Sequence, residues 1–150
     1  MIAKTRTLVV AGASAMLLLT LSVLPSWAAF SNATVNGTCS LSFVETGSDG
    51  GTNAAVGVLT FDGAGNVVPS SSQVANNGTN QGFSDFSNIQ SGSYSVNADG
   101  TGTLNLVFSG PSDGDSLDIV VDQVSNGFAQ EIRFMSTKTG KASMGVCRFQ

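Results

Sequence analysis

Histidine is absent from the 150-residue chain, and positive charge is scarce, with six lysine and arginine residues against ten acidic ones. Without imidazole, the sequence excludes Ser-His-Asp and Cys-His catalysis and histidine-based zinc sites. The acidic balance disfavours nucleic acid and anionic lipid as partners. Two cysteines, Cys39 and Cys147, lie too far apart in sequence for a CxxC redox pair. We therefore expect no catalytic residue and no cofactor, and a non-enzymatic role is favoured.

The start of the chain has the three-part layout of a secretory signal peptide. Lys4 and Arg6 precede an apolar stretch over residues 8–24, which ends in Pro25-Ser26-Trp27-Ala28. Small residues at 26 and 28 place cleavage between Ala28 and Ala29, with a cut one residue later as the alternative. The stretch is marginal for a retained membrane anchor. We expect residues 1–28 to be a signal helix and residues 29–150 to be a single domain, exported to the periplasm or the outside medium and not membrane-spanning.

Removal of the signal makes the exported domain more acidic. Two basic residues are lost with it, so four remain against ten acidic residues and the net charge moves from −4 to −6. The domain also lacks helix-forming runs and is rich in Gly, Ser, Thr and Asn. Such a composition disfavours helices and suits strands joined by tight turns.

Apolar residues alternate with polar ones in short segments bounded by Gly, Asn, Asp or Pro, which is typical of strands with one wet face. Eight such segments are predicted: about residues 38–45, 55–61, 67–74, 92–96, 103–108, 117–121, 128–135 and 142–149. Successive hairpins make an antiparallel meander, and eight strands remove both exposed edges by closing into an up-and-down barrel. We expect residues 75–90 to be the longest loop, in which Phe83 and Phe86 cover one end of the core.

The two cysteines support closure of the barrel. Cys39 lies near the start of the first predicted strand and Cys147 near the end of the last, so antiparallel pairing of these strands would bring the two thiols together. In the chain-entropy model, a bond closing a loop of about 100 residues contributes about 4.7 kcal/mol, less any strain. An exported protein meets an oxidising compartment, which favours a disulfide over two separate buried thiols.

Two segments carry a resemblance. The first is Leu59-Thr60-Phe61-Asp62-Gly63-Ala64-Gly65-Asn66, and the second runs from Gly92-Ser93-Tyr94 to Gly102-Thr103-Leu104. They resemble a group of small exported bacterial proteins that repeat a TFDGAGN hairpin followed by GxYxVxxDGTGTL. The resemblance covers roughly the middle third of the chain and implies a lipocalin-like or allene-oxide-cyclase-like barrel. It implies no catalytic residue, because both motifs consist of turn and core residues.

Two functions fit such a domain. An eight-stranded barrel is at the size where its interior is either filled or takes one small ligand. A small apolar ligand would lie among the predicted inward residues Phe43, Tyr94, Leu106, Phe108, Ile119 and Phe134. The alternative is a surface or extracellular assembly or adhesion subunit with a polar exterior. The sequence leaves the oligomeric state open.

Acidic residues suggest two weaker possibilities. A carboxylate-dependent or cyclase-like enzyme would have to use acids whose strand positions predict an outward orientation: Glu45, Asp85, Asp118, Asp122 and Glu131. The best calcium candidate is Asp113, Asp115 and Asp118, but the EF-hand spacing is absent and Asp is also an ordinary turn residue. We expect Glu131 and Arg133 to share a strand face and to pair with neighbours such as Arg148 in a solvated surface patch.

Overall fold

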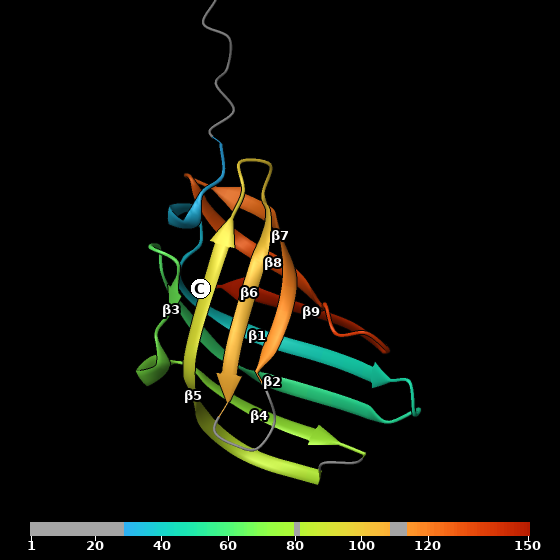
Figure 1. Ribbon diagram of the computed structural model, residues 1–150. Helices are drawn as coiled ribbons and strands as arrows, with labels where there is room; N and C mark the ends of the chain where they lie inside the picture. Colours follow the sequence, from blue (N-terminus) through green and yellow to red (C-terminus); the bar gives the residue numbers. More distant parts are fainter. Residues whose placement is uncertain (1–28, 80–81, 109–113) are drawn as a thin grey trace, which may run out of the picture.

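The computed structural model describes residues 29–79, 82–108 and 114–150 of the chain (Figure 1). The predicted signal peptide and its cleavage site lie before the first described residue. Within these ranges, no helix is long and apolar enough to cross a membrane. Nine strands and two short 3-10 helices are present: η1 Asn32–Thr34, β1 Asn36–Gly47, β2 Thr52–Asp62, β3 Asn66–Val67, η2 Pro69–Ser71, β4 Gln73–Gly78, β5 Gly82–Val96, β6 Thr101–Phe108, β7 Asp115–Ser125, β8 Phe128–Ser136 and β9 Lys141–Phe149.

The strands form one closed antiparallel barrel, as predicted. Each strand from β5 to β8 pairs with the next along the chain, and β1 pairs with both β2 and β9. β3 and β4 share one position, because both pair with β2 on one side and with β5 on the other. The nine strands therefore occupy eight positions around the barrel, and the pairing of β1 with β9 closes it.

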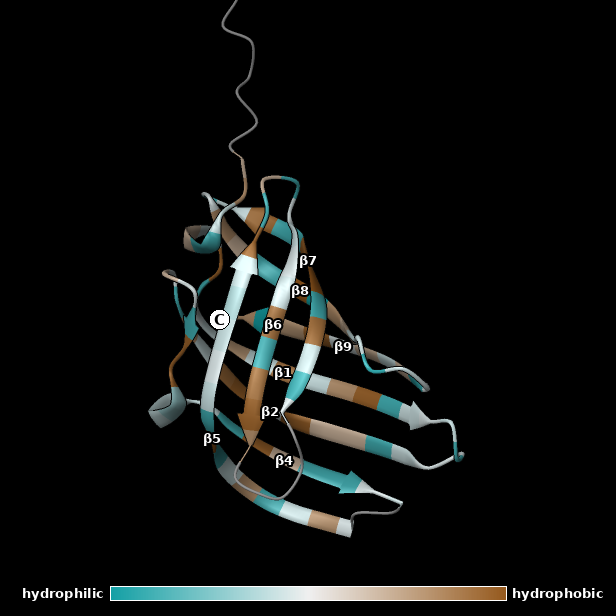
Figure 2. Ribbon diagram, in the orientation of Figure 1, coloured by the Kyte–Doolittle hydropathy of each residue, from teal (hydrophilic) through white to brown (hydrophobic). Residues whose placement is uncertain are grey.

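The core follows from alternation along each strand. Residues two apart point to the same face of a sheet, so apolar residues at alternate positions gather inside the barrel while Ser, Thr and Asn face water. Figure 2 shows the resulting bands of brown and teal along the strands. The most deeply buried large side chains are Phe61, Leu59, Leu104, Ile119 and Ile132.

Turn chemistry fixes the hairpins where the sequence predicts them. Asn126 and Gly127 both have positive φ, at 53° and 83°, as a two-residue type I′ turn requires. Pro69 interrupts the third predicted strand: it lacks an N–H donor, and the chain makes the 3-10 turn η2 between β3 and β4. The predicted strand over residues 67–74 is therefore two strands.

The prediction of a long loop over residues 75–90 was wrong. Residues 73–78 and 82–96 form the hairpin β4–β5, with a register irregularity between Val74 and Asn76. Phe83 and Phe86 do not cover the core, because they are 69% and 59% exposed. The polar composition concealed this hairpin: its inner face is polar at the tip and its outer face carries the two phenylalanines.

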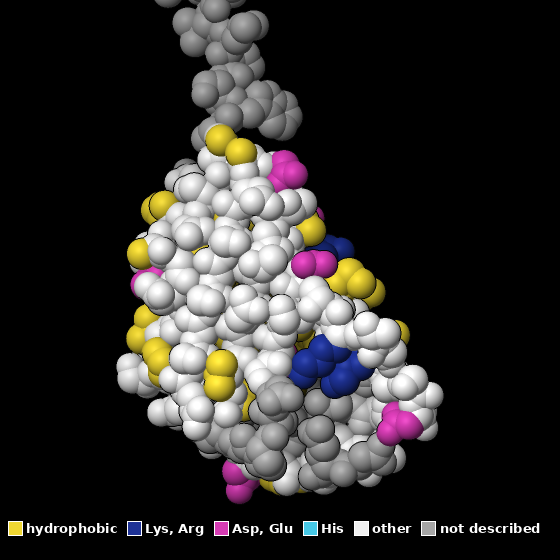
Figure 3. All heavy atoms as spheres, viewed as in Figure 1, with side chains coloured by type: hydrophobic (Ala, Val, Ile, Leu, Met, Phe, Trp, Pro, Cys, Tyr) yellow, Lys and Arg dark blue, Asp and Glu magenta, His cyan; other side chains and the backbone are white. Residues whose placement is uncertain are grey.

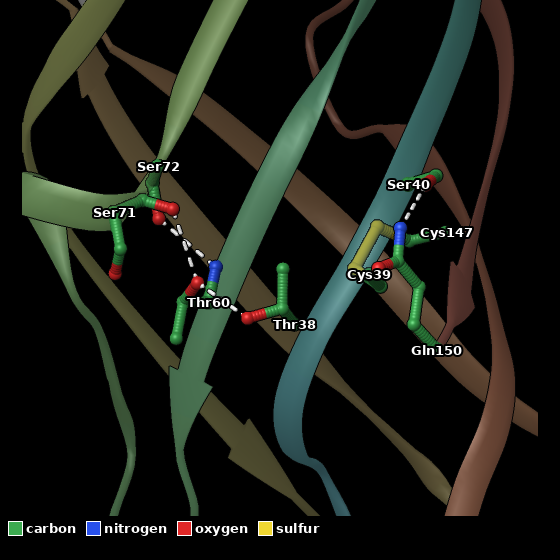
Figure 4. The surroundings of a disulfide bond; sticks show 8 residues. All are labelled: Thr38, Cys39, Ser40, Thr60, Ser71, Ser72, Cys147 and Gln150. Carbon is green, nitrogen blue, oxygen red and sulfur yellow. Dashed lines mark hydrogen bonds between the residues drawn. A yellow bond between two sulfur atoms is a disulfide. The ribbon is translucent and has the colours of Figure 1, made fainter.

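The predicted disulfide between Cys39 and Cys147 is present, with 1.99 Å between the sulfurs and 5.4 Å between the Cα atoms. Cys147 pairs with Leu41 and Cys39 with Phe149, so the bond joins β1 and β9 diagonally, between positions offset by two residues. Figure 4 shows the bond beside a set of outer hydrogen bonds that link β1, β2 and η2. In that set, Thr38 and Thr60 share a bond of 2.9 Å, and the Thr60 hydroxyl donates to the Ser71 carbonyl.

Candidate functional site

One end of the barrel is closed by the segment that precedes β1. Val35 is completely buried in the core, and η1 lies across the barrel end beside β5. The Tyr94 hydroxyl donates to the carbonyl oxygens of Val35 at 2.6 Å and Asn32 at 3.1 Å. The Val96 N–H donates to Asn32 Oδ1 at 2.8 Å. Burial raises the pKa of the Tyr94 phenol, so the hydroxyl keeps its proton for these bonds.

The two motif segments meet at this closed end. Asp62 accepts hydrogen bonds from the backbone N–H groups of Ala64 and Asn66, at 2.7 and 2.9 Å, and from the Asn66 amide at 2.7 Å. These bonds, with the Asn66 side chain contributing most, hold the pKa of the Asp62 carboxyl below its usual value. In the same turn, the Gly65 carbonyl accepts a hydrogen bond of 2.8 Å from the Tyr94 N–H. The motif residues therefore build the end wall of the barrel.

All six predicted interior residues belong to one apolar cluster. Five are buried, and Phe108 is partly buried against them. The rings of Phe43 and Phe134 stack with 5.8 Å between centroids. Tyr94 contacts Phe61 edge-on at 5.1 Å, at the closed end of the barrel. The predicted set thus spans the length of the interior.

The opposite end of the barrel flares. The backbone pairing of β8 with β9 runs as far as Phe134 and Gly145, and that of β5 with β6 runs as far as Ile89 and Phe108, the last residue described before position 114. The sheet of β9, β1, β2, β4 and β5 continues beyond both points, to Gly47 and Gly82 among others. Beyond the last of these pairs, β8 and β9 are joined by the bond from the Ser136 N–H to Ser143 Oγ. Among the described residues, the hairpins β1–β2 and β4–β5 extend past the other strands at this end (Figure 1).

The inner face of this extension is polar. Glu45 follows Cys39, Leu41 and Phe43 on the inward face of β1, so the prediction that it faces outward was wrong. Only 7% of Glu45 is exposed, and Lys141 Nζ donates to its carboxylate. An ion pair of this kind compensates the cost of burying a carboxylate.

Two asparagines complete this inner face. Asn53 pairs with Glu45 in register, and Asn76 pairs with the inward residue Ala55. The side-chain oxygens of Asn53 and Asn76 are buried and have no hydrogen-bond partner among the described residues. We call Glu45, Asn53, Asn76 and Lys141 the inner rim of the flared end.

The calcium candidate is not assembled by the described part of the chain. Asp113 lies outside the described residues, Asp115 pairs with Lys138 at 2.9 Å, and Asp118 is exposed on the outer face of β7. No group of three or more acidic or cysteine side chains suited to a metal ion occurs in the described ranges. Lys138 lies between β8 and β9, and Lys141 begins β9. Figure 3 shows basic side chains gathered on one side of the lower part of the molecule.

The predicted pairing of this patch with Arg148 is confirmed, because Glu131 contacts Arg148 at 2.8 Å; Glu131 also contacts Arg133 at 3.1 Å. Arg133 also contacts Asp122 at 2.7 Å. Glu131 itself is buried beneath these side chains rather than solvated, which corrects the prediction. The hydrogen bond from Arg148, assisted by that from Arg133, holds the pKa of the Glu131 carboxyl below its usual value.

An apolar row crosses the outer face of the flared end. Successive register pairs place Met144, Val44, Ala54, Asn77 and Phe83 side by side on β9, β1, β2, β4 and β5. Met144, Val44 and Phe83 are 77%, 56% and 69% exposed. A groove of about 550 Å³ runs beside Val44 and Ala54 and is lined further by the residues 52–53 and 77–79.

Sequence reasoning missed the closing segment, the inner rim and this outer row. Glu45 is two residues from Phe43, so alternation along the strand was the signal that it faces inward. Its ion-pair partner Lys141 lies 96 positions away, and nothing in the sequence indicated that contact. Comparison with protein-family models, curated proteins and solved structures finds no match to this chain.

Proposed function

We propose that the chain is an exported, non-enzymatic binding protein whose barrel holds a small apolar ligand. The observation that carries the proposal is the difference between the two ends. One end is closed by the chain's own N-terminal segment and the Tyr94 hydrogen bonds, whereas the other flares and ends in an inner rim of polar side chains. A ligand would enter at the flared end and contact the predicted interior residues nearest to it, Phe43, Phe108 and Phe134.

The chemistry of the interior supports binding rather than catalysis. The carboxylates that a hydrolytic mechanism would need are engaged elsewhere: Glu45 with Lys141, and Glu131 with two arginines. Asp85, Asp118 and Asp122 are exposed on the strands β5 and β7. The disulfide fits export to an oxidising space, whether the periplasm or the outside medium.

The test is binding of the neutral apolar dye N-phenyl-1-naphthylamine, whose fluorescence rises in apolar surroundings. The informative variant is Ala55→Phe, because Ala55 is partly buried against the core and its new ring would occupy the ligand's space. Ala54→Phe is the matched control, since Ala54 is exposed on the outer face. We expect Ala55→Phe to weaken dye binding at least tenfold and Ala54→Phe to leave it unchanged.

Two outcomes would contradict the proposal. If the unmodified protein fails to bind the dye, the interior does not accept apolar ligands. If Ala54→Phe weakens binding and Ala55→Phe does not, the dye lies in the outer groove instead. Circular dichroism shows whether each variant keeps its strands, because overpacking an interior costs roughly 1–3 kcal/mol.

The outer apolar row favours a second candidate, an assembly subunit that self-associates through this row. The pairing of β1 with β9 closes the barrel, so we expect contact to be side by side through this row rather than by strand exchange. Size-exclusion chromatography with light scattering separates the candidates. A concentration-dependent oligomer that is lost in Met144→Glu supports assembly, and a monomer at all concentrations counts against it.

A further inference from the structure

The inner rim contains two hydrogen-bond acceptors that the folded chain leaves unused. Asn53 Oδ1 and Asn76 Oδ1 are both buried, and neither has a partner among the described residues. Leaving a buried polar atom unpaired is costly, so such atoms call for an explanation in each case. Here both occur on neighbouring strands of one sheet face.

The two oxygens belong to one surface. Asn53 and Asn76 lie on the inward face of β2 and β4, because each is an even number of residues from a buried inward residue, Leu59 and Val74 respectively. In register, Asn53 pairs with Gly78, two residues beyond Asn76. A Cβ built on Gly78 would lie only 3.1 Å from Asn53 Oδ1, so the glycine leaves space for this amide. The pair are diagonal cross-strand neighbours, which places their side chains within reach of one head group.

The charges beside these amides are already compensated. The Glu45 carboxylate is paired with Lys141, and the Asp115 carboxylate with Lys138. What the rim offers is therefore neutral acceptors beside apolar side chains. Asn53 lies two residues from Ala55 on β2, Asn76 lies opposite Ala55 on β4, and Phe43 lies opposite Ala55 on β1. A ligand complementary to this arrangement has an apolar body and an uncharged end that donates hydrogen bonds.

We propose that the ligand of this barrel is a small amphiphile with an uncharged, hydrogen-bond-donating head group, such as a primary amide or a diol, bound by Asn53 and Asn76. This inference rests on the proposed function, since it names the chemistry of the ligand that enters at the flared end. The apolar body contacts the phenylalanines, and the N–H or O–H groups of the head donate to the two amide oxygens. A carboxylate head fits less well, because it has acceptors where the rim needs donors.

The test compares two probes with the same acyl chain and carbonyl, one with N–H donors and one in which methyl groups replace them. Decanamide has two N–H groups, and N,N-dimethyldecanamide has the same chain and carbonyl but none. Both are measured by displacement of N-phenyl-1-naphthylamine from the purified exported protein, first stripped of ligand on a hydrophobic resin. We expect decanamide to bind about tenfold more tightly, the factor that about 1.4 kcal/mol of net hydrogen bonding produces.

Variants assign the preference to the two asparagines. Asn53→Leu combined with Asn76→Leu removes both acceptors at similar volume, and we expect the ratio of the two affinities to fall to about one. Asn77→Leu is the matched control: it is the same substitution on β4, but Asn77 is exposed on the outer face, and we expect its ratio to match the unmodified protein. The double variant should also unfold at a higher urea concentration than the unmodified ligand-free protein.

The outcomes are distinguishable. If neither probe nor the dye binds, the proposed function fails and this inference with it. If the dye and both probes bind with equal affinity, or if the dimethyl amide binds more tightly, the barrel binds apolar ligands but the donor preference is refuted. If the preference persists in the double asparagine variant, other residues recognise the head group and the assignment is overturned. The comparison of probes on the unmodified protein needs no variant to fold.

Discussion

Replacing Tyr94 by Phe tests how the closed end is held. The substitution keeps the ring, and with it the edge contact to Phe61, but removes the hydroxyl that donates to the carbonyls of Val35 and Asn32. The bond to Val35 is the shorter, at 2.6 Å, and Val35 is fully buried, so water cannot replace the lost donor without opening the segment. A lost bond together with an unpaired buried acceptor costs roughly 2 kcal/mol.

Urea unfolding followed by circular dichroism measures this cost. With a slope of about 2 kcal/mol per molar urea, the midpoint should fall by about 1 M. Amide hydrogen exchange should quicken at residues 30–35 before it quickens in β6 and β7, because only the closing segment depends on the hydroxyl. An unchanged midpoint together with unchanged exchange at residues 30–35 would refute this account of the closed end.

The same residue gives a direct spectroscopic check, because Tyr94 is the only tyrosine in the chain. Burial raises its pKa in the folded state above the ordinary value of 10.0. Because the pKa is raised, the contribution of the protonated Tyr94 hydroxyl to the free energy of unfolding is complete below pH 10 and is lost as the pH rises through the folded-state pKa. Absorbance of the phenolate near 295 nm should therefore appear at higher pH in folded than in urea-unfolded protein. Coincident titrations would contradict burial of the hydroxyl.

Three further predictions concern stability. Cys39→Ser with Cys147→Ser should lower the free energy of unfolding by about 4 kcal/mol, measured with urea; a loss below about 1 kcal/mol would mean that the bond adds little to the β1–β9 pairing. Asp62→Asn should make the free energy of unfolding fall less steeply as the pH is lowered. The pKa of Asp62 is lower in the folded than in the unfolded protein, so the stabilisation by its carboxylate is complete above the unfolded-state pKa near 3.8 and is lost as the pH falls further. Equal pH profiles for the two proteins would argue against the turn bonds. Lys141→Met should cost about 1–3 kcal/mol by leaving the Glu45 carboxylate unpaired, and Glu45→Gln in the same chain should restore most of it; no restoration would place the cost elsewhere.

The sequence was a reliable guide wherever local turn chemistry and alternation agreed. The turn at Asn126-Gly127 requires positive φ at both positions, and these two residue types tolerate it best, so the hairpin was predictable without tertiary information. The β1–β9 pairing was predictable from the cysteines for a different reason, since a disulfide constrains two distant positions at once.

Two of the errors share a physical cause, because they fall where an inward position is polar. The hairpin β4–β5 has Asn76 and Ser84 opposite one another on its inner face, so apolar alternation, the usual signal for a strand, is missing there. Glu45 was assigned outward because a buried carboxylate is costly, and its compensation by Lys141 depends on a contact from the other end of the chain. Both errors lie at the flared end, where the proposed ligand site is.

Native mass spectrometry of the protein, purified from its own host without organic solvent or detergent, tests the central claim most directly. A barrel closed at one end and flared at the other should carry one small molecule. We therefore predict a complex heavier than the disulfide-bonded chain by a few hundred daltons, with the excess mass released on unfolding. A spectrum containing only the bare chain, from protein that also fails to take up N-phenyl-1-naphthylamine, would contradict the claim that the interior is a binding site.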